Sequence, residues 1–253
     1  MPEELQLRIH GDDSLPTLIY LPGLHGDWTL VSDFRRQLAG KVRFVEFVYP
    51  RTLTWSLDDY AAAIEAALAQ NGIRNGWLLG ESYGSQILWA LVARRKVLAQ
   101  GIILAGGFVK HTWRWGVHLV HTVFSRTPIK LLGWLLSGYA QFARVRYRHS
   151  PETLASIEEF VARRTELDRQ AALHRLDRIA ENNPRMIVCQ TELPVYYLSG
   201  GLDPIVPWPL VQSWLKKNCL SLRDSKIILT ADHNILGTAP VKAARQVLVW
   251  MQA

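Results

Sequence analysis

The stretch that decides the fold is Gly80-Glu81-Ser82-Tyr83-Gly84, which follows the apolar run Trp77-Leu78-Leu79 and precedes Ile87-Leu88-Trp89-Ala90-Leu91-Val92. The first apolar run predicts a short buried strand, and the second predicts a helix that faces the core. A G-x-S-x-G sequence between a strand and a helix is typical of a tight turn that exposes a serine hydroxyl above a sheet. Both glycines fit such a turn, because a β-carbon would clash with the neighbouring strand and helix. The pattern alone is equally compatible with an ordinary strand-to-helix turn, so its interpretation depends on the rest of the chain.

Three further turns follow strand-like runs. Residues 17–21 lead into Pro22-Gly23-Leu24-His25-Gly26, a glycine-rich turn whose N–H groups can approach a ligand atom closely. Residues 195–199 precede Gly200-Gly201-Leu202-Asp203-Pro204, and residues 226–229 precede Ala231-Asp232-His233-Asn234. A hydroxyl, a carboxylate and an imidazole therefore follow predicted strands in the order Ser82, Asp203, His233.

This order and placement resemble the α/β-hydrolase superfamily, from about residue 17 to the C-terminus apart from residues 108–192. The resemblance implies that Ser82 is the nucleophile, that His233 is the general base and that Asp203 orients its imidazole. It also implies an oxyanion hole made by the N–H groups of Leu24 and Tyr83.

Four of the residues in these turns have alternative interpretations. Asp203 precedes Pro204 and could simply shape a turn. Asp232 competes with it as the acid, although it would point elsewhere because it is adjacent to His233. His25 is a reserve base on the oxyanion loop, but we expect it to shape that loop or the wall of the substrate pocket. Glu81 is similar to the glutamate of G-E-S-Y-G elbows in serine carboxypeptidases, and we expect it to be a buried, hydrogen-bonded carboxylate.

Strands alternate with helices over much of the chain, which predicts a mostly parallel sheet with helices on both faces. The predicted strands include residues 5–9, 17–21, 42–48 and 102–104, and the predicted helices are 30–38, 57–68, 82–97, 207–217 and 240–251. The expected fold is an α/β-hydrolase fold with its core in residues 1–107 and 193–253, forming one structural domain.

The strand pattern stops between residues 108 and 192. Thr127-Pro128 and Ser150-Pro151 each indicate the start of a helix, with the proline at its first position. We therefore expect a helical cap after the sixth strand position of the superfamily, where its members carry a lid over the nucleophile. The apolar underside of such a lid would line the substrate pocket, with Trp113 and Trp134 among the binding residues.

Basic charge is concentrated in this predicted cap. Residues 110–149 carry seven lysines and arginines and no acidic residue, in a chain with a formal charge of +7. Arg144, Arg146 and Arg148 alternate and could share one face, which is either a solvated surface or a docking site for an anionic partner. The arrangement resembles the pimeloyl-carrier-protein methyl esterases in charge and placement, which implies an acidic acyl carrier protein as one partner; acyl-CoA or an anionic membrane surface also fits the charge. Nucleic acid is a poor candidate, since no reading motif accompanies the charge.

Composition sets the remaining limits. The chain of 253 residues is 49% hydrophobic and 20% charged, as expected of one globular unit. Its two cysteines, Cys189 and Cys219, do not form a disulfide framework, and its polar start resembles no signal peptide. The sequence has neither an apolar run of about 18 residues nor a metal or dinucleotide motif, so we expect a cytoplasmic protein without a membrane span, metal or cofactor.

These observations favour a serine hydrolase that cleaves an ester or related acyl bond through an acyl-enzyme, with a carboxylesterase as the leading interpretation. The alternatives are a hydrolase of carrier-linked or CoA-linked esters and thioesters, a peptidase of the proline-iminopeptidase kind, a carbon–carbon bond hydrolase and a cofactor-free haloperoxidase. A non-catalytic, ligand-binding member of the fold is the alternative from a different class.

Overall fold

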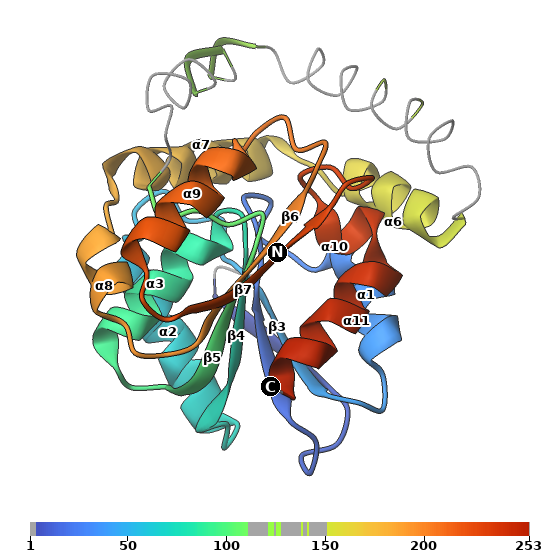
Figure 1. Ribbon diagram of the computed structural model, residues 1–253. Coiled ribbons are helices and arrows are strands. Elements are labelled where there is room, and N and C mark those ends of the chain that lie inside the picture. The colour runs from blue at the N-terminus through green and yellow to red at the C-terminus, as the bar shows by residue number, and fades with distance from the viewer. Residues whose placement is uncertain are drawn as a thin grey trace.

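A seven-stranded sheet forms the centre of the molecule (Figure 1). The computed structural model describes residues 4–110, 121–123, 125–127, 138, 141 and 151–252. The strand order is β1-β3-β2-β4-β5-β6-β7; β1 pairs antiparallel with β3, and the other five pairings are parallel. The strands are β1 (Gln6–His10), β2 (Thr17–Leu21), β3 (Arg43–Val48), β4 (Asn75–Glu81), β5 (Leu98–Ala105), β6 (Val195–Gly200) and β7 (Leu222–Ile228). The predicted mostly parallel sheet of an α/β-hydrolase fold is confirmed.

Helices cover both faces of this sheet (Figure 1). One face packs against α2 (Leu57–Gln70), α3 (Gly84–Arg94), α8 (Arg185–Gln190) and α9 (Trp208–Asn218). The other packs against the short 3-10 helix η1 (Thr29–Val31), α1 (Ser32–Leu38), α10 (Ile235–Thr238) and α11 (Pro240–Met251). Two separate apolar clusters result, one on each side of the sheet.

Strand β2 shows how the sequence supplies both clusters. Ile19 and Leu21 belong to the cluster under α2 and α3, whereas Leu18 and Tyr20 belong to the cluster under α1 and α11. Successive side chains of a strand point to opposite faces, so a central parallel strand covered on both sides is apolar throughout. All of β2 is accordingly buried.

The strand predicted over residues 102–104 runs over Leu98–Ala105, and two other predicted elements also have clearly different bounds in the structure. The helix predicted over residues 82–97 spans only Gly84–Arg94, because Ser82 belongs to the preceding turn and Arg95 ends the helix with a left-handed φ of 55°. The last strand was expected over residues 226–229 but runs over Leu222–Ile228. Its first half was missed because an edge strand exposes polar side chains, here Arg223 and Asp224.

The described residues between β5 and β6, within the predicted cap, include the helices α6 (Pro151–Ala162), α7 (Glu166–Glu181) and α8. Helix α6 begins at Pro151 as predicted, and α7 begins with a capping box formed by Thr165 and Asp168. In Figure 1, α6 and α7 lie in the upper part of the molecule. Helix α6 contacts η1 and α10, which follow the carboxyl ends of β2 and β7, so α6 lies at that edge of the sheet.

Substitution of Trp89 tests the packing of α3 on the sheet. Its side chain is completely buried in the cluster shared with α2. We expect Trp89→Ala to lower the free energy of unfolding by about 3–5 kcal/mol, because it removes a large apolar side chain and leaves a cavity. Leu220, which is 89% exposed, is the control, and Leu220→Ala should change stability by less than about 0.5 kcal/mol in urea denaturation. Equal effects of the two substitutions would contradict this packing.

Candidate active site

The turn between β4 and α3 holds Ser82 in a strained backbone conformation. Its φ is +49°, in the left-handed region that non-glycine residues rarely adopt. The flanking glycines are required by close packing, since a β-carbon at Gly84 would lie 2.1 Å from the Leu21 carbonyl oxygen and one at Gly80 would lie 2.9 Å from the Ser85 α-carbon. The G-x-S-x-G sequence therefore forms the tight strand-to-helix turn that it predicted.

The structure brings Ser82, His233 and Asp203 into one chain of hydrogen bonds. His233 Nε2 lies 2.8 Å from Ser82 Oγ, and His233 Nδ1 lies 2.8 Å from Asp203 Oδ2. A carboxylate only accepts hydrogen bonds, so Nδ1 carries the proton and Nε2 is left to accept from the serine hydroxyl. This arrangement can remove a proton from Ser82 Oγ.

Asp203 combines the two roles considered for it. Its Oδ1 accepts hydrogen bonds from the N–H groups of Ile205 and Val206, at 2.8 and 2.9 Å, and so shapes the turn after β6. Its Oδ2 faces His233, and the whole side chain is excluded from solvent. The turn thus fixes the carboxylate that orients the imidazole.

Asp232, the competing acid, makes different contacts. Its Oδ1 accepts hydrogen bonds from the Asn234 N–H at 3.0 Å and from the Thr238 hydroxyl at 3.1 Å. These bonds link it to both ends of α10, whereas Nδ1 of the neighbouring His233 faces Asp203. The geometry therefore favours Asp203 as the partner of the imidazole.

Leu24 and Tyr83 lie on two loops that touch. Leu24 belongs to the turn after β2, and Tyr83 precedes α3 directly. The backbone of Gly84 lies against the carbonyl groups of Leu21 and Pro22, at the start of the same turn. Among the described residues, no acceptor forms a hydrogen bond with the N–H of Leu24 or Tyr83. Both groups are therefore available to a ligand oxygen.

His25 lies beside Leu24 on this turn and contacts the cap. Its ring meets that of Phe160, on α6, edge to face at a centroid distance of 5.6 Å. Burial lowers the pKa of His25 to about 4, and the nearby Asp27 carboxylate only partly opposes this effect. The ring is therefore neutral at pH 7, and its Nε2 has no hydrogen-bond partner within the described part of the chain. The expected substrate-binding residues Trp113 and Trp134, and the expected docking residues Arg144, Arg146 and Arg148, lie outside the described residues.

Glu81, next to the serine, is buried as predicted. The Tyr20 hydroxyl donates a hydrogen bond to its Oε2. Burial raises the pKa of Glu81 to about 7, despite the lowering effect of that hydrogen bond. A titratable carboxyl group thus belongs to the residue that precedes Ser82. Within the described residues, its recorded hydrogen-bond partner is the Tyr20 hydroxyl and not the Ser82 hydroxyl.

Two polar residues at the site escaped the sequence analysis. Gln86, on α3, donates to the Phe108 carbonyl at 2.8 Å and accepts from the Asn182 side chain at 2.9 Å. Arg175, on α7, is 2% exposed and donates to the Leu24 carbonyl at 2.8 Å. The sequence holds a signal for the burial of Arg175. Its spacing of four residues from Ala171 and from Ile179 places all three on one face of a helix, and this face of α7 is buried.

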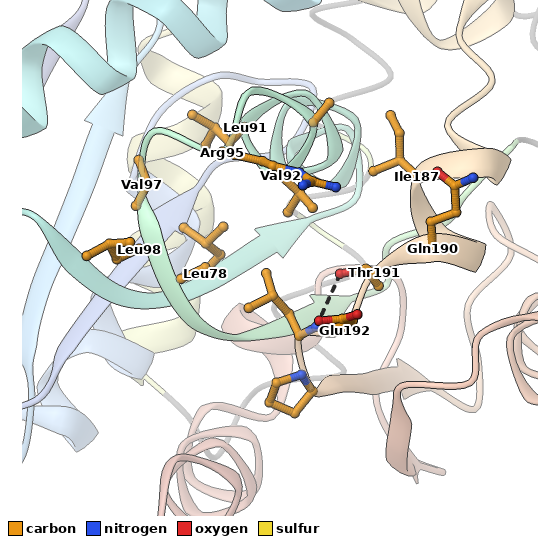
Figure 2. Close-up of a pocket in the computed structure, with 14 residues that line it drawn as sticks. Leu78, Leu91, Val92, Arg95, Val97, Leu98, Ile187, Gln190, Thr191 and Glu192 are labelled. Carbon is orange, nitrogen blue, oxygen red and sulfur yellow. Dashed lines mark hydrogen bonds between the residues drawn. The ribbon is translucent and has the colours of Figure 1, made fainter.

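A surface pocket of about 580 Å³ lies elsewhere in the molecule (Figure 2). Leu98, which begins β5, and Thr191 and Glu192, which precede β6, line it. These residues lie at the amino ends of parallel strands, whereas Ser82 follows the carboxyl end of β4. The pocket is therefore separate from the candidate site.

Neither a metal site nor a membrane span is found in the described part of the chain. No three His, Cys, Asp or Glu side chains there are grouped so that they could hold a metal ion. None of its helices combines the length and apolar character needed to cross a membrane.

Comparison with known proteins identifies the family. Residues 31–240 match the model of the alpha/beta hydrolase fold family, and the chain belongs to this family. A hydrolase from Pseudomonas aeruginosa PA01 has a similar structure, with a TM-score of 0.81 and 14% identity over 98% of this chain and 94% of that one. No curated protein sequence matches the chain.

Two further solved structures carry more specific names. A thermophilic esterase from Thermogutta terrifontis has a TM-score of 0.76 and 16% identity over 98% of this chain and 93% of that one. An enol-lactonase from Burkholderia xenovorans LB400 has a TM-score of 0.79 and 15% identity over 98% and 96% of the two chains. At these identities the similarity shows the fold and leaves the reaction to be argued from the site.

Glu81 gives a testable pH dependence. The folded pKa of about 7 lies above the ordinary value of 4.5, so the folded state holds this proton more tightly than the unfolded state. Stability should therefore decline as the pH rises from about 4.5 through 7, by about 3 kcal/mol in total. Glu81→Gln should remove this decline in urea denaturation measured between pH 4.5 and 8. The exposed Glu192 is the control, and Glu192→Gln should follow the wild-type curve; a Glu81→Gln curve with the wild-type slope would contradict the expected proton uptake.

Proposed function

We propose that the protein is a serine hydrolase that cleaves esters or related acyl bonds, most simply a carboxylesterase. The observation that carries this proposal is the pair of 2.8 Å contacts that link Asp203, His233 and the strained Ser82. A carboxylate, an imidazole and a serine hydroxyl that are linked in this order by hydrogen bonds form an activated nucleophile on several unrelated folds. The family and the neighbouring esterase structures agree with a hydrolase and do not name a substrate.

In the first half of the reaction, Ser82 Oγ attacks the carbonyl carbon of the bound ester while its proton passes to His233 Nε2. Asp203 stabilises the imidazolium that forms through its bond to Nδ1. The carbonyl oxygen becomes an oxyanion and accepts hydrogen bonds from the N–H groups of Leu24 and Tyr83. The carbon–oxygen bond to the alcohol then breaks, and the alcohol leaves with the proton from His233 Nε2.

In the second half, water replaces the alcohol. His233 Nε2 takes one proton from the water as its oxygen attacks the acyl carbon, and a second oxyanion forms in the same site. Collapse of this intermediate breaks the bond to Ser82 Oγ, which recovers its proton from His233. The products are a carboxylic acid and the free enzyme, so the protein groups alone supply the acid–base chemistry.

Covalent labelling tests the role of Ser82. A fluorophosphonate should add one phosphonyl group to the wild-type protein, because its phosphorus reacts with an activated serine as the ester carbonyl does. Intact-mass spectrometry should show this adduct in the wild type and in Ser213→Ala, which alters an exposed serine on α9, but not in Ser82→Ala. An adduct of equal yield on Ser82→Ala would refute the assignment.

The acid is tested by paired substitutions of Asp203 and Asp232. Asp203→Asn places an N–H₂ group against His233 Nδ1, which favours the wrong tautomer and should lower kcat about 10⁴-fold. Asp232→Asn keeps an oxygen for its bonds to Asn234 and Thr238 and should lower kcat less than about tenfold. Hydrolysis of a chromogenic short-chain ester measures both, and a reversed ranking would transfer the role of the acid to Asp232.

A further inference from the structure

Arg175 is a buried cation without a carboxylate partner among the described residues. It lies on α7 and is 2% exposed, yet no ion pair with a described residue involves it. Burying an unpaired charge is costly unless the surroundings provide hydrogen bonds. The hydrogen bonds of this guanidinium therefore show which parts of the chain compensate for its burial.

Those contacts join two loops of the core. Nη1 donates to the Leu24 carbonyl at 2.8 Å, and Nη2 donates to the Pro50 carbonyl at 3.1 Å. Leu24 follows β2, and Pro50 follows the neighbouring strand β3. The guanidinium carbon also lies 5.5 Å from the centre of the Tyr49 ring. One side chain of the cap thus bridges the loops at the carboxyl ends of two adjacent strands.

The loop after β2 is shaped around this guanidinium. A β-carbon at Gly26 would lie 2.6 Å from Arg175 Nη1, so any larger residue there would displace the guanidinium from its present position. Gly26 also has a φ of +78°, which glycine adopts without strain. Its carbonyl accepts a hydrogen bond from the Tyr49 N–H at 2.8 Å, which ties the loop to the end of β3.

Two ion pairs hold the neighbouring parts of the cap to the same loops. Arg164, between α6 and α7, donates to Asp27 at 2.5 Å, and Arg51 donates to Asp168 of α7 at 2.5 Å. Both pairs have at most 17% of any side chain exposed, so solvent weakens them less than surface pairs. Helix α7 is therefore docked firmly enough for Arg175 to act on Leu24.

We propose that Arg175 is a positioning residue that fixes Leu24 in the conformation that presents its N–H to the oxyanion. This inference rests on the proposed serine hydrolase function. The bond to the Leu24 carbonyl restrains the peptide that follows Leu24. In the proposed reaction, the N–H of the same residue donates to the oxyanion. The oxyanion hole is then complete only when α7 is docked, which couples the cap to the chemical step as well as to substrate binding.

Kinetics of three variants test this role. Arg175→Met keeps an unbranched apolar side chain but removes both hydrogen bonds. Arg175→Lys keeps the charge but reaches fewer carbonyls. Arg169→Met is the control and alters a salt bridge to Glu166 on the same helix. An oxyanion donor acts mainly in the transition state, and loss of one costs about 10²–10³-fold in kcat. A displaced donor should cost less, so Arg175→Met should lower kcat about 10–100-fold and leave KM within about threefold. Arg175→Lys should fall between Arg175→Met and the wild type, and Arg169→Met should match the wild type.

Amide hydrogen exchange provides a readout that does not depend on activity. Arg175→Met should speed exchange in residues 23–28 while leaving β4 and β5 protected, and Arg169→Met should not affect this loop. If Arg175→Met fails to fold by circular dichroism, Arg175→Lys carries both measurements.

The outcomes separate the two proposals. A folded Arg175→Met variant with wild-type kcat and unchanged loop exchange would overturn the positioning role. Faster exchange throughout the chain, with kcat and KM changed together, would make Arg175 a general stability residue and would also overturn it. Failure of a fluorophosphonate to label Ser82 in the wild type would instead refute the hydrolase function, while the exchange data would still decide whether Arg175 holds the loop.

Discussion

The left-handed backbone of Ser82 is the constraint on which the site depends. Such a conformation costs a non-glycine residue about 1–2 kcal/mol, so the surroundings must enforce it. Gly84 does so by packing against the end of β2, and the Ser82 N–H donates to the Ala105 carbonyl at the end of β5 at 3.0 Å. The turn is thereby held from both neighbouring strands, and the serine hydroxyl is directed to the edge where β6 and β7 deliver Asp203 and His233.

The helix that follows this turn also contacts both the segment after β5 and the end of α7. Ser85 Oγ accepts from the Phe108 N–H, and Gln86 contacts both the Phe108 carbonyl and Asn182. Phe108 lies where the chain leaves the core after β5, and Asn182 caps the end of α7. Ser85 and Gln86, within four positions of Ser82, are fully buried and hydrogen-bonded. They therefore join the turn at Ser82 to the segment after β5 and to the end of α7.

The sequence predicted those turns and strands that are determined by neighbouring residues in the chain. The turn at Ser82 follows from two glycines between apolar runs, and the positions after β6 and β7 follow from short apolar strands that end in polar residues. The choice of Asp203 over Asp232 as the acid depends on side-chain directions. The adjacency of Asp232 to His233 in the sequence already favoured Asp203, whose Oδ2 lies 2.8 Å from His233 Nδ1. Arg175 was missed for a different reason: an arginine on a polar helix predicts a solvated side chain, and only the docking of α7 places it against Leu24. The start of β7 was missed because an exposed edge strand lacks the apolar pattern of a buried one.

The two buried ionisable groups beside the turn have opposite effects on the charge that the proposed reaction creates. Arg175 is a cation near Leu24, and its field favours an oxyanion held by the Leu24 N–H. Glu81 adjoins Ser82, and its ionised form would oppose the same charge. Because its pKa is raised to about 7, part of the population is neutral at that pH, and an oxyanion nearby would favour the neutral form further. Burial thus weakens the unfavourable charge of Glu81. In the proposed reaction, the Arg175 cation and a neutral Glu81 carboxyl group would both favour a negatively charged transition state.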